Sequence, residues 1–117
     1  LFSEFKGALT EQFVCQHLKT IDDFGIYYYT NERGSCEIDF IMDTGEQIVP
    51  VEVKAEVNLK AKSLKTFREK FHPELSLRLS MADYRKEDWL LNLPLYAVGE
   101  IRRLNEWKPD DSLILSK

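Results

Sequence analysis

The chain has 117 residues of mixed charge and a net charge of −4. This length suffices for one domain with a hydrophobic core but not for two, so we expect residues 1–117 to form a single domain. The sequence contains no apolar run of about 18 residues and no signal-peptide pattern, so we expect no membrane partner. The acidic balance argues against a protein that attracts nucleic acid over its whole surface.

The two cysteines, Cys15 and Cys36, indicate a reducing environment. Neither belongs to a CxxC or CxxH motif, and two cysteines are too few for a disulfide framework. We therefore expect both to be free thiols in or near the core of a cytoplasmic protein.

The N-terminal segment predicts a helix. Over residues 3–21, apolar side chains recur with a spacing close to the 3.6-residue period of an α-helix. The expected buried face consists of Leu9, Phe13, Val14, Cys15, Leu18 and Ile21. Two aspartates and a glycine within residues 22–25 end the pattern.

The next three segments have the composition of β-strands. They cover residues 25–31, 36–43 and 47–54. The short polar connection at residues 43–46 predicts that the second and third strands form a hairpin. Pro50 has no N–H group for a β-ladder, so it predicts an edge position or a bulge in the third strand.

The second half of the chain continues the alternation of helices and strands. A helix from about Ala61 within residues 58–73 is followed by a strand at 74–80, a polar loop at 81–89 and a closing helix at 93–104. The expected core residues of the two helices are Leu64, Phe67, Phe71, Leu95, Tyr96, Val98 and Ile101. The whole order predicts an α/β fold with helices that flank a mixed central sheet.

Two carboxylates and a lysine in the predicted hairpin are the main candidates for a functional site. Strand alternation puts Asp39 on one face of its strand, and Glu52 and Lys54 together on one face of theirs. In a normal register, Asp39 and Glu52 converge, and Mg²⁺ commonly uses one or two carboxylates together with phosphate oxygens. The alternative is a solvated strand face with an ion pair worth roughly 0–1 kcal/mol.

The same residues resemble a known nuclease motif. Asp39, twelve intervening residues and then Glu52-Val53-Lys54 resemble the PD-(D/E)XK motif of restriction-endonuclease-like nucleases. The segment "KGALTEQFV", with Glu11, is similar to the first helix of Holliday-junction resolvases. Over residues 5–101, "GSCEIDFIM", "IVPVEVKAE", "LKAKSLKTF" and "NLPLYAV" resemble the C-terminal domain of a group of prokaryotic AAA-type ATPases.

This resemblance implies a restriction-endonuclease-like αβββαβ core and a set of site residues. Asp39 and Glu52 would be ligands of Mg²⁺ or Mn²⁺, Lys54 the catalytic lysine and Glu11 an accessory acid. Glu37 is an alternative to Asp39 as the ligand. The resemblance also implies that this chain is the C-terminal part of a longer protein, with the ATPase region before Leu1 as its partner. No P-loop motif occurs in the sequence itself.

The basic residues are concentrated in the second predicted helix. Residues 54–70 contain six Lys or Arg residues against two Glu residues. We expect that DNA phosphates are contacted by Lys60, Lys62, Lys65 and Arg68. An ordinary amphipathic helix with a lysine-rich solvent face is the alternative. The functions that remain open are Mg²⁺-dependent hydrolysis of DNA and a catalytically silent module that binds DNA or protein.

Overall fold

The computed structural model describes residues 2–31, 34, 36–55 and 61–107 of the chain. In this part, the helices and strands are α1 (Phe2–Lys19), β1 (Gly25–Thr30), β2 (Glu37–Asp43), β3 (Ile48–Lys54), α2 (Lys62–Phe71), β4 (Ser76–Ser80), β5 (Arg85–Lys86), β6 (Leu90–Pro94) and the 3₁₀-helix η1 (Leu95–Glu106). None of the helices described here is both long enough and apolar enough to cross a lipid bilayer.

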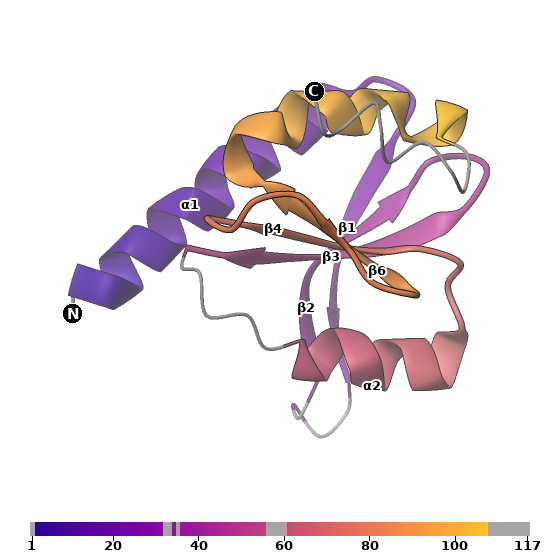
Figure 1. Ribbon diagram of the computed structural model, residues 1–117, viewed down its shortest axis with the longest axis horizontal. Helices are drawn as coiled ribbons and strands as arrows, with labels where there is room; N and C mark the ends of the chain where they lie inside the picture. The colour runs from indigo at the N-terminus through magenta and orange to yellow at the C-terminus, as the bar shows by residue number, and fades with distance from the viewer. Residues whose placement is uncertain (1, 32–33, 35, 56–60, 108–117) are drawn as a thin grey trace.

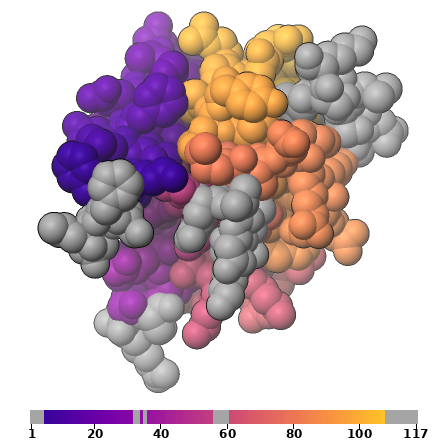
Figure 2. All heavy atoms as spheres, turned by 60° about the vertical axis from the view of Figure 1, so that its left-hand side comes forward, coloured from indigo at the N-terminus to yellow at the C-terminus, as the bar shows by residue number. Residues whose placement is uncertain are grey.

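The strands form one mixed sheet between two layers of helix. The strand order is β1-β2-β3-β4-β6-β5. The β3–β4 and β4–β6 pairs are parallel, and the other pairs are antiparallel. Helices α1 and η1 lie side by side on one face of the sheet, and α2 covers the other (Figures 1 and 2). The predicted α/β class, with a mixed sheet flanked by helices, is confirmed.

The two faces of the sheet are packed differently. On the α1 face, apolar side chains of the central strands pack against α1 and η1 in one large cluster that includes Leu18, Phe40 and Ile101. On the α2 face, a smaller cluster joins Leu64 and Phe67 to buried side chains of the sheet and its loops. Burial of apolar surface is therefore concentrated on the α1 face, where most of the hydrophobic stabilisation arises.

The predicted hairpin of β2 and β3 is confirmed, but Pro50 lies in an inner strand instead of at an edge. Thr44 N–H donates to the carbonyl oxygen of Gln47 at 3.0 Å. Because hydrogen-bonded and non-hydrogen-bonded pairs alternate in an antiparallel ladder, this bond makes Ile41 and Pro50 a non-hydrogen-bonded pair. The nitrogen of Pro50 thus faces β4, and the β3–β4 pairing begins only at Val51, so no ladder bond is lost.

The expectations for residues 81–104 were partly wrong. Two residues of the predicted loop form β5, and the first part of the predicted closing helix belongs to β6. The reason is burial: all five residues of Leu90–Pro94 are buried between β4 and β5, as is typical of an inner strand in a parallel region. Pro94 is extended and precedes η1, which is a 3₁₀-helix.

Several residues predicted to be in the core are exposed. Leu9 and Phe13 of α1 are 54% and 48% exposed, whereas Val14 and Leu18 are fully buried. With about 3.6 residues per turn, Leu9 and Phe13 lie on the side of α1 that is turned away from Val14 and Leu18, and the sheet covers only the latter side. Likewise exposed are Phe71 and Tyr96, which lie near the ends of their helices. The apolar positions of α1 thus span more than one side of the helix, and only the side of Val14 and Leu18 is packed in the core.

We predict that the two leucines of α1 differ strongly in their contribution to stability. Leu18→Ala should lower the free energy of unfolding by about 3 kcal/mol, because it leaves a cavity in the main core. Leu9→Ala in the same helix should change it by less than about 0.5 kcal/mol, because that side chain is largely exposed. Urea denaturation followed by circular dichroism measures both, and equal losses would contradict the placement of α1.

Candidate functional site

The end of the β2–β3 hairpin brings Asp39 and Glu52 to neighbouring positions. Phe40 and Val51 are the last paired residues of the two strands, and Asp39 directly precedes Phe40 while Glu52 directly follows Val51. The Val53 N–H group then donates to Asp39 Oδ2 at 2.8 Å. A side-chain carboxylate thus continues the pairing where the backbone ladder ends, and it fixes Asp39 beside the strand that carries Glu52.

Glu52 has a buried carboxylate with one oxygen left without a partner. The residue is 8% exposed, and its Oε1 atom lies 3.6 Å from Nζ of Lys54. Its Oε2 atom is buried and has no hydrogen-bond partner among the residues that the structure describes. Buried polar atoms without partners are rare and costly in folded proteins. The Lys54 side chain is about one-third exposed, so its ammonium group also reaches solvent.

The surroundings of Glu52 favour its neutral form. Burial is the largest cause that raises the pKa of Glu52, and the negative charge of Asp39 raises it further. The positive charges of Lys54 and Arg78 act in the opposite direction without cancelling the effect. A bound cation would reverse this balance, because it favours the charged form of both acids.

Asp39 lies in electrostatic range of two further acids. Burial raises its pKa most, and the charge of Glu37 adds to this, whereas the hydrogen bond from Val53 lowers it. On α1, burial raises the pKa of Glu11, and the charge of Asp39 raises it further. Helix α1, which carries Glu11, covers the face of the sheet opposite to α2. Glu11 is nevertheless close enough to Asp39 for their charges to interact. Glu37 is exposed at the start of β2.

A divalent cation would have two protein carboxylates at this place. Within the described ranges, no three His, Cys, Asp or Glu side chains come together as a metal-binding group. Mg²⁺ often keeps several waters and uses only one or two carboxylates together with phosphate oxygens of the substrate. Asp39 and Glu52 are the two carboxylates that could hold such a cation, and Oε2 of Glu52, which has no partner among the described residues, could be one of the ligands.

The predicted DNA-contacting residues fall into three groups. Lys62 and Lys65 are exposed on α2 and border a hollow at the start of that helix. Arg68 is exposed, and its guanidinium carbon lies 5.3 Å from the centre of the Trp89 ring, in a cation–π contact. Lys60 lies outside the described residues.

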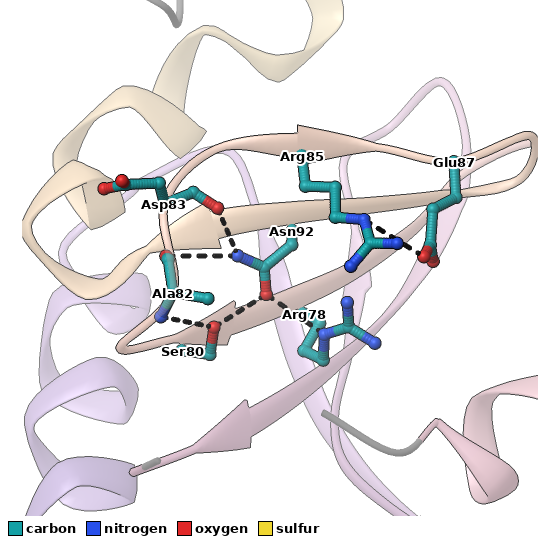
Figure 3. Close-up of polar contacts among 7 residues, drawn as sticks. All are labelled: Arg78, Ser80, Ala82, Asp83, Arg85, Glu87 and Asn92. Carbon is teal, nitrogen blue, oxygen red and sulfur yellow. Dashed lines mark hydrogen bonds and ion pairs between the residues drawn. The ribbon is translucent and has the colours of Figure 1, made fainter. Parts of the chain in front are cut away.

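Sequence reasoning missed a buried polar network next to the acids. Arg78, on β4, is the register partner of Glu52 on β3 and of Asn92 on β6. Its Nε atom donates to Asn92 Oδ1 at 3.0 Å, and the hydroxyl of Ser80 donates to the same oxygen at 2.7 Å (Figure 3). The alternation of polar and apolar residues in β4 was the available signal, but it did not show what these side chains would face.

The fold and the site define an α/β domain with paired acids and a lysine at the end of a central hairpin. A family model described as a domain of unknown function, DUF4143, matches residues 6–97, and the chain belongs to this family. No curated protein and no solved structure matches the chain. The function therefore has to be argued from the site itself.

We predict that Glu52→Gln stabilises the protein at neutral pH. The pKa of Glu52 is higher in the folded protein than its ordinary value of 4.5 in the unfolded chain. The loss of stability therefore begins as the pH rises above 4.5, grows until the pH passes the folded pKa, and remains at higher pH. The substitution should therefore raise the free energy of unfolding by about 1 kcal/mol at neutral pH, and this gain should shrink towards pH 4.5. Urea denaturation in EDTA across this range measures the difference.

The exposed Glu37 provides the control for this measurement. Glu37→Gln removes the same charge from the neighbouring strand and should change the stability by less than about 0.5 kcal/mol. If Glu52→Gln proves less stable than the parent at neutral pH, the ion pair with Lys54 outweighs the cost of burial, and the interpretation is wrong.

Proposed function

We propose that this domain hydrolyses phosphodiester bonds of DNA with the help of Mg²⁺ or Mn²⁺. The observation that carries the proposal is the buried Oε2 atom of Glu52, which has no partner among the described residues. The Glu52 carboxylate interacts electrostatically with Asp39, and its other oxygen lies 3.6 Å from Nζ of Lys54. A buried oxygen without a partner is costly in the free protein but useful as a cation ligand. The resemblance to the PD-(D/E)XK motif supports the same residues independently of their geometry.

Each residue of the site has a distinct role in this proposal. The carboxylates of Asp39 and Glu52 hold the cation, which when bound polarises a phosphate oxygen and lowers the pKa of a bound water. The Lys54 ammonium group, close to Glu52 but in reach of solvent, stabilises the negative charge that develops on the phosphate. Glu11 contributes a further negative charge from α1.

The order of elements supports a restriction-endonuclease-like core. The first six elements are α1, β1, β2, β3, α2 and β4, which is the αβββαβ order of that core. The resemblance further supports a place at the C-terminus of a cytoplasmic AAA-type ATPase, which would then be the partner within the same parent chain.

A catalytically silent module that binds DNA or protein is the second candidate. Two observations favour it: the described residues include no group of three potential metal ligands, and Asp39 is engaged with the backbone of Val53. In this case the acids stabilise the hairpin, and the fold serves binding for the ATPase.

We predict that the protein nicks supercoiled plasmid or cleaves branched DNA in millimolar Mg²⁺ or Mn²⁺, and that Asp39→Asn and Lys54→Met each lower the rate at least about 100-fold. Asparagine keeps an acceptor oxygen for the Val53 N–H group, so the hairpin should remain intact. Gel assays with and without EDTA measure cleavage, and circular dichroism verifies the fold.

Glu37→Gln is the matched control because it alters an exposed acid of the same strand. It should retain cleavage, whereas cleavage that survives both Asp39→Asn and Lys54→Met would refute the proposed site. Metal-independent DNA binding without any cleavage would support the silent module instead.

A further inference from the structure

A basic pocket of about 400 Å³ lies between the first turn of α2 and the strands β4, β5 and β6. We use this name for the hollow whose charged lining is Lys62, Lys65, Arg78, Arg85 and Glu87. Four positive charges thus face one negative charge. A concave surface with such an excess attracts and concentrates anions.

Arg78 is the buried anchor of the basic pocket. It is only 3% exposed, and its Nε atom donates to Asn92 Oδ1 at 3.0 Å. Asn92 is itself held, because its Nδ2 atom donates to the carbonyl oxygens of Ala82 and Asp83 at 3.2 and 2.9 Å (Figure 3). Among the residues drawn in Figure 3, the only hydrogen bond of Arg78 is the one from Nε, and none leaves its two terminal nitrogens. The guanidinium group is therefore fixed through Nε, while its terminal N–H groups make no bond to the residues shown there.

The neighbours of Arg78 leave its charge poorly compensated. Burial is the main cause that lowers the pKa of Arg78, and the positive charge of Arg85 contributes to the same effect. The negative charges of Glu87 and Glu52 oppose both effects without cancelling them. The Glu87 carboxylate is exposed and lies 3.5 Å from Nε of Arg85, and the Glu52 carboxylate lies 3.6 Å from Nζ of Lys54, so each acid has another cation beside it. Buried charges are normally paired, since removal of an ion from water costs several kcal/mol or more. An anion between Arg78 and Arg85 would supply the negative charge that Glu52 and Glu87 provide only in part.

The start of α2 adds to the positive field of the basic pocket. The N-cap residue Ala61 makes no side-chain hydrogen bond to the helix, so the first N–H groups of α2 lack a side-chain cap. Such groups and the helix dipole favour negative charge at this end. Lys62 and Lys65, on the first turn, complete a rim of donors around the pocket.

We propose that the basic pocket binds a phosphate group of a DNA strand, with Arg78 and Arg85 as the principal donors. Arginine is suited to this role because its planar guanidinium group can bind two phosphate oxygens at once. The pocket adjoins the acidic site, since Arg78 and Glu52 are register partners on neighbouring strands. That the phosphate belongs to DNA rests on the proposed function, whereas the anion site rests on the pocket alone.

The test measures DNA binding in EDTA, so that it does not depend on cleavage. Fluorescence anisotropy with a labelled duplex compares the parent chain with Arg85→Gln/Lys65→Gln, whose two side chains are exposed and should not affect folding. We expect about tenfold weaker binding and a smaller dependence on salt concentration, because two phosphate contacts are lost. Glu87→Gln removes the opposing charge and should tighten binding about two- to threefold.

Arg102→Gln/Arg103→Gln is the control, because it removes two exposed positive charges from η1 on the opposite face of the sheet. If this control weakens binding as much as Arg85→Gln/Lys65→Gln, only the net charge matters and the pocket proposal fails. Inorganic phosphate could also raise the melting temperature of the parent chain but not that of Arg85→Gln/Lys65→Gln. If this occurs and no DNA binding is detected, DNA is not the source of the phosphate. Absence of both effects would overturn the anion site, even if plasmid cleavage were observed.

Discussion

The bond from the Val53 N–H group to the Asp39 carboxylate is the contact on which the arrangement of the site depends. In the alternation of the β2–β3 ladder, Val53 would pair with Ile38. The carboxylate of Asp39 takes over as acceptor at 2.8 Å, and Ile38 packs in the cluster under α2 while Phe40 packs on the other face. One acid thus ends the regular ladder, and the same exchange fixes Asp39 beside Glu52.

The buried acids and the buried arginine belong to one polar row across the sheet. Glu52, Arg78 and Asn92 are successive register partners on β3, β4 and β6, and Arg85 on β5 is the next. Negative charge at one end and positive charge at the other suit a substrate that offers both a metal-bridged phosphate and a free one. The acidic net charge is compatible with this arrangement, because four positive side chains line one pocket although the chain as a whole is negative.

Local sequence patterns were sufficient to predict the helices and strands up to β4, but they did not predict which later segments would pack beside these elements. Alternation and a short connection correctly predicted the β2–β3 hairpin, since both are properties of adjacent residues. In the sheet, β4 pairs with β6 and not with β5, which is the next strand along the chain. The burial of Leu90–Pro94 and the contact of Arg78 with Asn92 both depend on this pairing, and no local sequence pattern predicts it. The exposure of Leu9 and Phe13 was not predicted either, because the apolar residues of α1 span several sides of the helix and only packing against the sheet selects the side of Val14 and Leu18.

The unequal packing of the two faces has a consequence for motion. Helix α2 is held mainly by Leu64 and Phe67, because much of the sheet surface beneath it is polar. Detachment of α2 would expose only the smaller of the two apolar clusters and would leave the larger cluster around α1 and η1 intact. Amide hydrogens of α2 should therefore exchange with solvent through a partial opening, well before global unfolding, and each such event would uncover the row of charged side chains for a ligand too large to enter the closed form.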